Sequence, residues 1–138
     1  MSAKDIFHEI VKLALQKQQW IITHDPMRLE FGDVKFQVDL GAERLLAAER
    51  GSERIAIEIK SFLKASAITD FYGALGQFLS YRLALTALEP DRLLYMAVPL
   101  DAYKTFFQLG FTKAAIESYK ILLIVYDIDN EVIVEWIN

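Results

Sequence analysis

Residues 54–60 read Arg-Ile-Ala-Ile-Glu-Ile-Lys, and this stretch decides the fold and the chemistry that we expect. Apolar and polar positions alternate with a period of two, which is typical of a β-strand with one buried face. The three isoleucines would share one face of this strand. Ala56, Glu58 and Lys60 would share the other face, so the carboxylate and the amine are predicted neighbours.

The segment before it, residues 35–40, alternates in the same way and predicts a second strand. Its apolar side chains are expected to share one face: Phe36, Val38 and Leu40. Asp39 would then point to the same side as Glu58.

A turn at Gly51-Ser52 would fold these two arms into an antiparallel pair. This turn places Asp39 opposite a position a few residues beyond Glu58. A bulge or bend at Gly41 could reduce the offset.

The remaining elements follow from helical periodicity, caps and turn residues. They are a helix over residues 2–17, a short strand over 20–23, a helix over 67–88, a buried strand over 92–98, helical segments over 101–119 broken near Gly110, and a final hairpin of 121–126 with 132–137. Strands joined by a crossover helix predict an α/β fold of the α+β mixed-sheet type, with helices on the faces of a central sheet. The length suits one domain over residues 1–138.

Composition excludes several classes of protein. The chain has no cysteine, so disulfides, thiolate metal sites and cysteine nucleophiles are ruled out. The start lacks the apolar core of a signal peptide, and no apolar run is long enough to span a bilayer, so we expect a cytosolic protein with no membrane partner. The net charge of −4 gives no overall attraction to nucleic acid, but bound divalent cations would neutralise clustered carboxylates.

Asp39, Glu58 and Lys60 are the candidate catalytic residues. Two adjacent carboxylates repel each other unless a cation lies between them, so Asp39 and Glu58 are expected to bind Mg²⁺ or Mn²⁺. Lys60 would then orient water or stabilise charge on a phosphate. The plainer alternative is a surface ion pair worth roughly 0–1 kcal/mol, since Glu-x-Lys occurs by chance in about one of every two or three such chains.

Glu9, at the edge of the buried stripe of the first helix, is a further candidate metal ligand, although a surface glutamate fits the same position. His8 and His24 lack the paired spacing of a zinc site and are interpreted as structural. Glu43, Arg44 and Arg54 fit a solvated face, where the arginines could contact phosphate.

The helix over 67–88 has two distinct sides. Its apolar stripe is expected to contain Ile68, Tyr72, Leu75, Leu79 and Leu83. On the opposite side Gln77 and Tyr81 are four residues apart, near Asp70, Gly73 and Ala74. This side either lets a substrate approach or is simply solvated.

The order Asp39, Glu58-Ile59-Lys60, Gln77-x-x-x-Tyr81 resembles the PD-(D/E)XK nuclease pattern, including the glutamine and tyrosine helix element of its RecB-like branch. Val38 stands where the family name has proline. The resemblance implies a restriction-endonuclease-like core in which Gln77 and Tyr81 position the DNA strand beside the catalytic residues.

The whole chain is similar to the XisH family, cyanobacterial controlling factors for excision of the fdxN element during heterocyst development. The similarity is carried by AKDIFH at 3–8, DLGAERLLAAE at 39–49, ALGQF at 74–78, EPDR at 89–92, EVIV at 131–134 and WIN at 136–138. It implies a role in programmed DNA rearrangement, with DNA, a companion protein of the XisI type and a site-specific recombinase as partners.

Three functions remain open at this point. The chain could be a Mg²⁺-dependent DNA endonuclease or a cleaving accessory to a recombinase. It could be a catalytically silent regulator that binds DNA or assembles with XisI and the recombinase, or a structural interaction domain. The sequence leaves the recognised DNA and the oligomeric state, including a homo-oligomer, undetermined.

Overall fold

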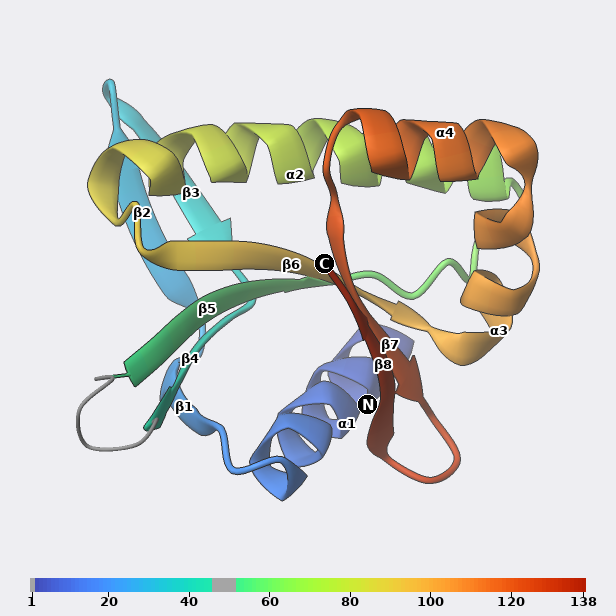
Figure 1. The fold of residues 1–138 in the computed structure, drawn as a ribbon, viewed down its shortest axis with the longest axis horizontal. Helices are drawn as coiled ribbons and strands as arrows, with labels where there is room; N and C mark the ends of the chain where they lie inside the picture. Colours follow the sequence, from blue (N-terminus) through green and yellow to red (C-terminus); the bar gives the residue numbers. More distant parts are fainter. Residues whose placement is uncertain (1, 46–51) are drawn as a thin grey trace.

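The structure, a computed structural model, describes residues 2–45 and 52–138. Its described part contains a six-stranded sheet and a separate two-stranded sheet (Figure 1). The large sheet has the order β1 (Ile21–His24), β4 (Leu40–Leu45), β5 (Ser52–Ile59), β6 (Arg92–Pro99), β7 (Leu122–Asp127) and β8 (Val132–Ile137). The small sheet is the hairpin of β2 (Met27–Phe31) and β3 (Val34–Val38).

The large sheet is mixed, as predicted. β5, β6 and β7 run parallel to one another, whereas β1 with β4, β4 with β5 and β7 with β8 are antiparallel pairs. Parallel neighbours need crossover connections, and helices provide both of them here. These helices are α2 (Ala67–Leu88) between β5 and β6, and α3 (Leu100–Lys104), η1 (Phe106–Gln108) and α4 (Gly110–Ser118) between β6 and β7.

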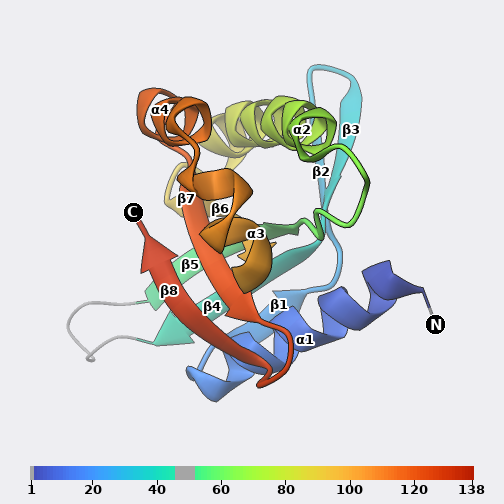
Figure 2. The same cartoon turned by 90° about the vertical axis from the view of Figure 1, so that its right-hand side faces the viewer.

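Helices cover both faces of the large sheet. In Figures 1 and 2, α2 and α4 lie on one side, and α1 (Ala3–Lys17) lies on the other. Alternation along β5 supplies both cores: Ala56 packs into the cluster under α2, whereas Ile55 and Ile57 pack into the cluster under α1. The predicted face assignment of residues 54–60 is therefore confirmed, and so is a central mixed sheet flanked by helices.

Local signals placed several element ends correctly. The Ser2 hydroxyl accepts a hydrogen bond from the Asp5 backbone N–H and caps α1, which ends at Lys17 as predicted. The helix expected over 67–88 has these bounds. The break expected near Gly110 is also present, because η1 ends at Gln108 and α4 begins at Gly110.

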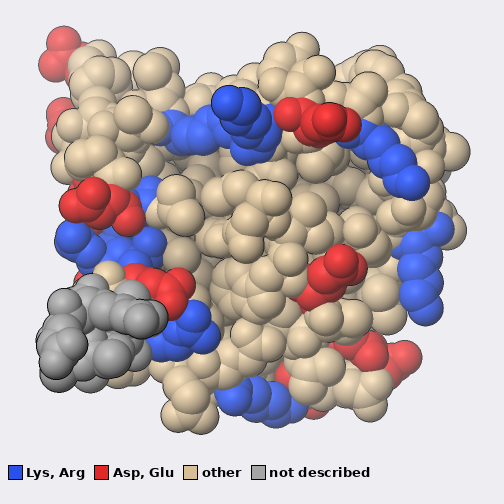
Figure 3. Space-filling view, viewed as in Figure 1, with Lys and Arg blue, Asp and Glu red and all other residues tan. Residues whose placement is uncertain are grey.

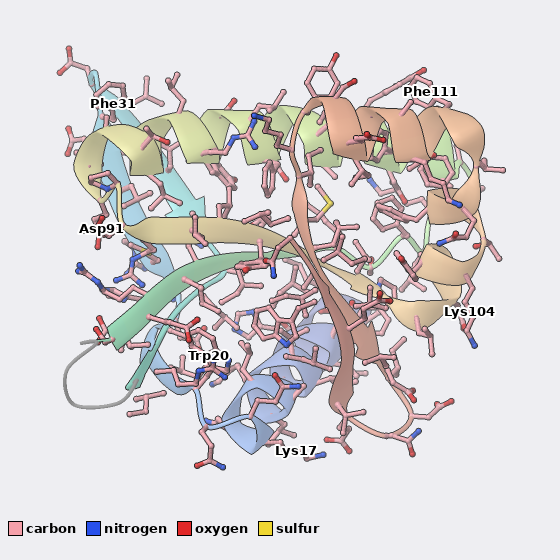
Figure 4. All side chains as sticks on the ribbon, viewed as in Figure 1. Lys17, Trp20, Phe31, Asp91, Lys104 and Phe111 are labelled. Atoms are coloured by element: carbon pink, nitrogen blue, oxygen red, sulfur yellow. The ribbon has the colours of Figure 1, made fainter. Side chains whose placement is uncertain are left out.

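The single strand predicted over residues 35–40 is wrong. The chain leaves the hairpin after Val38 and enters the large sheet at Leu40, so two strands of different sheets meet at Asp39. Val38 is consequently buried under α2 and Leu40 under α1, and the two side chains do not share a face. β2 was not predicted, and its end at Phe31 lies near the hairpin tip (Figure 4).

The predicted register is also corrected. Leu40 pairs with Ile57 and Leu45 with Ser52, so Asp39 lies beside Glu58 and not opposite a later position. The expected turn at Gly51-Ser52 included a residue outside the described ranges, and Ser52 itself is already in β5.

The buried stripe of α2 differs from the predicted one. Phe71, Ala74 and Phe78 are buried, whereas Tyr72 and Leu83 are 61% and 66% exposed. The helix is apolar on nearly all sides, so periodicity did not identify the face that meets the sheet.

β6 is buried along most of its length, as expected for a central strand, although Leu93 is exposed. Within the residues that the structure describes, no helix combines the length and hydropathy needed to cross a membrane.

Candidate functional site

Two hydrogen bonds connect Asp39 to Glu58 and to the next residue, Ile59, where β4 begins and β5 ends. The Asp39 backbone N–H donates to Glu58 Oε1 at 3.2 Å. The backbone N–H of Ile59 donates to Asp39 Oδ2 at 2.7 Å. These bonds hold the two predicted carboxylates side by side, which is the arrangement that the sequence could only suggest.

Glu58 is a buried acid, with 7% of its surface exposed. Burial, followed by repulsion from the Asp39 carboxylate, raises the pKa of Glu58 to about 7, although the Lys60 ammonium opposes this shift. A neighbouring cation would favour the ionised form of both acids.

Lys60 is held on both sides of its ammonium group. Its Nζ lies 3.3 Å from Glu58 Oε2 and donates a hydrogen bond to Gln77 Oε1. Its backbone is fixed as well, because its N–H donates to the Ala97 carbonyl at 2.9 Å and its carbonyl accepts from the Tyr126 hydroxyl at 3.0 Å. The contributions of Ala97 and Tyr126 have no signal in the sequence, since they come from strands far along the chain.

Gln77 and Tyr81, predicted to act from α2, both lie near the acids. Gln77 reaches the site through Lys60. Tyr81 packs edge-on against Phe36 of β3, with ring centroids 6.0 Å apart. Burial, then the charges of Glu58 and Asp39, raises the pKa of Tyr81, so this phenol stays protonated at neutral pH.

A cavity of about 500 Å³ opens beside these residues. One wall is the N-terminal half of α1, and the opposite wall is the N-terminal half of α2 with the segment that joins it to β5. Figure 2 shows the start of α1 and that joining segment on the same side of the molecule. Asp39, Lys60 and Gln77 line the cavity, so the predicted site is accessible to a ligand.

The other sequence candidates are placed differently. The Glu9 side chain is 54% exposed and lies 3.7 Å from Lys12, and it does not join the carboxylate pair. His24 contacts the Thr23 hydroxyl. His8, which the sequence indicated as structural, is bonded to Asp25 at 2.6 Å and also lines the cavity.

The candidate surface residues also have local partners. Arg44 forms a 2.7 Å ion pair with Glu53 and lies over the Trp20 ring at 4.8 Å. Arg54 lies 4.0 Å from Asp91, and Glu43 lies 3.8 Å from Arg92. Lysines, arginines and acids are interspersed around the margin of the face in Figure 3, with no large basic patch on it. Three lysines gather instead in the lining of the cavity: Lys4, Lys60 and Lys64.

The donor set fits a hard divalent cation in part. Asp39 and Glu58 provide two adjacent carboxylates, the ligands that Mg²⁺ prefers, and Mg²⁺ usually keeps several waters beside one or two carboxylates. Across residues 2–45 and 52–138 no group of three or more His, Asp or Glu side chains is arranged around a metal position. Backbone carbonyls, water or substrate oxygens would supply the other positions.

Comparison with known proteins gives one consistent result. The chain is 49% identical to an XisH family protein from Nostoc punctiforme PCC 73102, with a TM-score of 0.89 over 97% of this chain and 100% of that one. It is 52% identical to an fdxN element excision controlling factor protein from Anabaena variabilis, also with a TM-score of 0.89, over 97% of this chain and 99% of that one.

No curated protein matches the chain. The XisH protein family matches residues 1–134. Because this match and both solved structures span almost the whole sequence, the chain belongs to the XisH family.

Proposed function

We propose that this chain is a divalent-metal-dependent DNA endonuclease of the PD-(D/E)XK type that acts in the excision of a DNA element. The single observation that carries the proposal is the convergence of Asp39, Glu58 and Lys60 beside one cavity. The role in excision is supported by the Anabaena variabilis relative, which is named as an excision controlling factor. A restriction-endonuclease-like core agrees with a mixed sheet that carries one acid on β5 and the other immediately before the adjacent strand β4.

Asp39 and Glu58 would hold Mg²⁺ or Mn²⁺. When bound, this cation polarises the phosphodiester and lowers the pKa of a coordinated water. The hydrogen bonds to Asp39 Oδ2 and Glu58 Oε1 keep both carboxylates fixed before the ion arrives, which reduces the entropy lost on binding. Charge repulsion between the acids provides a reason for binding a cation at this position.

Lys60 supplies the positive charge that the reaction needs beside the phosphate. Its ammonium lies between Glu58 and Gln77, and these two side chains fix its orientation. Only one of the two, Glu58, is an acid. Charge that develops on the phosphate oxygens would be stabilised by this preorganised donor. Gln77 acts as a positioning residue for Lys60, and the protonated Tyr81 hydroxyl is a hydrogen-bond donor near the same acids.

The local charge favours a polyanionic substrate despite the net charge of −4. The cavity is lined by three lysines and two aspartates, namely Lys4, Lys60, Lys64, Asp39 and Asp70. A divalent cation at Asp39 would make this lining more positive still. DNA phosphates would therefore meet a positive site on an otherwise acidic protein.

Plasmid nicking tests the proposal. The wild-type protein should convert supercoiled plasmid to open circles in Mg²⁺ or Mn²⁺ and should stop in EDTA. Asp39→Ala and Lys60→Ala should each lower the rate at least about a hundredfold, which is typical for loss of one transition-state contact. Lys113→Ala, a change at an exposed lysine of α4, is the matched control and should leave the rate unchanged. Cutting that survives Asp39→Ala would refute the metal site.

A second candidate function is a non-cleaving regulator that binds DNA or assembles with an XisI-type protein and a recombinase. The acidic net charge favours the form that assembles with protein partners, because that form needs no strong attraction of its own for DNA. Purified protein that binds a recombinase or companion but never nicks DNA with Mg²⁺ or Mn²⁺ would support this candidate over the nuclease.

A further inference from the structure

His8 presents a second functional group to the cavity, on the wall opposite Lys60. It lies on α1, four residues after Lys4, and both side chains line the cavity with Asp39. Residues four apart on a helix lie on the same face, so α1 directs both groups to one side. Nothing in the proposed cleavage chemistry uses His8.

The orientation of the His8 ring is fixed by a chain of three charged or polar groups. His8 Nε2 is bonded to Asp25 Oδ1 at 2.6 Å, and Asp25 Oδ2 lies 2.8 Å from Lys12 Nζ. Burial alone would raise the pKa of Asp25, but the hydrogen bonds from Lys12 and His8 lower it, so Asp25 stays a carboxylate. An ionised Asp25 accepts only, and Nε2 therefore carries the hydrogen that it receives.

The second ring nitrogen remains available. Among the described residues, no side-chain hydrogen bond engages His8 Nδ1. A histidine placed between two anions donates from both nitrogens, one to each. With Nε2–H donated to Asp25, Nδ1 donates to an anion in the cavity only in the doubly protonated ring, so binding at this position would take up the anion together with one proton.

We propose that His8, oriented by Asp25 and Lys12, binds a phosphate of the nucleic-acid substrate from the α1 wall, with Lys4 as a second cationic contact. The inference rests on the proposed function for the identity of the anion. It makes His8 a substrate-contact residue and Asp25 a positioning residue. The phosphate backbone would then be bound between α1 and the lysines of the opposite wall.

Fluorescence anisotropy with a fluorescein-labelled DNA oligonucleotide in Ca²⁺ tests this contact. His8→Gln retains an amide where Nε2 lies, so it preserves the bond to Asp25 and removes the Nδ1 donor. We expect affinity to fall about tenfold, the usual effect of one charge-assisted hydrogen bond. The slope of log K against log salt should become shallower by about 0.7–0.9, as for one lost cationic contact. His24→Gln, at the other histidine of the chain, should leave both values unchanged.

Asp25→Asn provides a sharper test, because the loss of charge and the loss of His8 orientation should change DNA affinity in opposite directions. Removing a negative charge should by itself strengthen binding of DNA. If Asp25 acts by orienting His8, its replacement weakens binding instead, whereas Asp91→Asn, at an 86% exposed aspartate, does not. An Asp25→Asn protein that binds as well as or better than the wild type would overturn the positioning role.

Failure of this inference differs from failure of the proposed function. Wild-type protein that binds the oligonucleotide but cuts nothing in Mg²⁺ would contradict the nuclease and leave the His8 contact supported by its variants. Unchanged affinity in His8→Gln would overturn the contact whether or not the protein cuts. Wild-type protein that binds no oligonucleotide even at low salt would overturn it as well.

Discussion

The hydroxyl of Tyr126 donates a 3.0 Å hydrogen bond to the backbone carbonyl of Lys60, across 66 residues of sequence. Tyr126 is fully buried in an apolar cluster, and this bond satisfies its hydroxyl group there. The bond ties the C-terminal part of β7 to Lys60, the residue that follows β5 and carries the candidate catalytic amine.

Tyr126→Phe should lower the free energy of unfolding by about 1 kcal/mol, because it removes one buried hydrogen bond and leaves a carbonyl unsatisfied. Any nicking activity should also fall, since the backbone that carries Lys60 loses a fixed point. Urea unfolding followed by circular dichroism measures the first effect. Tyr119→Phe, at a tyrosine that is 47% exposed, is the control, and equal stability of the two variants would contradict the prediction.

Glu58 should make the stability of the metal-free protein depend on pH. Its pKa is raised from an ordinary value of 4.5 to about 7, so its ionisation is less favourable in the folded chain than in the unfolded one. Such an acid costs no stability below its unfolded pKa, and its full cost is present above its folded pKa. Stability should therefore decline as pH rises from 4.5 to about 7, by about 3 kcal/mol.

Glu58→Gln isolates this contribution, because the amide retains an acceptor for the Asp39 backbone N–H and does not ionise. The stability difference between the wild type and Glu58→Gln should grow over this pH range and become constant above it. Guanidinium unfolding at several pH values in EDTA measures the difference. Parallel curves for the two proteins would show that the Glu58 ionisation does not differ between the folded and unfolded states.

Divalent metal should stabilise the protein through Asp39. At a free Mn²⁺ concentration of a hundred times Kd, linkage predicts about 2.7 kcal/mol of added stability. Asp39→Asn should remove most of the rise in Tm, whereas Asp91→Asn should keep it. Differential scanning calorimetry over a Mn²⁺ titration gives the comparison, and a full Tm rise in Asp39→Asn would place the ion elsewhere.

Two glycine-to-alanine substitutions should change the stability of the fold in opposite directions. A Cβ at Gly41 would lie 2.9 Å from His24 Nδ1 and 3.2 Å from its Cβ, so Gly41→Ala should strain the pairing of β1 with β4 by about 1–3 kcal/mol. A Cβ at Gly76 meets no atom within 4 Å on α2, and Gly76→Ala should add about 0.5–1 kcal/mol of stability. Thermal denaturation of the pair checks both signs.

Much of the architecture could be predicted because its signals are local. α2 has turn-forming residues at both ends, so its bounds could be predicted. Residues 54–60 alternate without interruption, so the two faces of β5 followed from the sequence. The hairpin of β2 and β3 could not be predicted in this way. Its strands are only five residues each, and the face that they bury is decided by contact with α2.

The site was predictable in its residue types and not in its register. Glu58 and Lys60 were identifiable from their chemistry and from the alternation along β5, whereas the face of Asp39 was inferred from a single strand over 35–40 that does not exist. The pairing of Leu40 with Ile57 depends on a connection that periodicity does not determine. The bond from His8 to Asp25 joins a helix to a turn 17 residues away. Only the fold brings these two residues together.

Because the chain passes from one sheet to the other at Asp39, the hairpin of β2 and β3 does not set the positions of the two carboxylates. The position of Asp39 is set by β4 lying on β5, while β2 and β3 pair only with each other. Extra residues inserted at Gly32-Asp33 would lengthen an outlying loop and leave the carboxylates where they are. The hairpin tip is thus a suitable attachment point for a dye or an affinity tag.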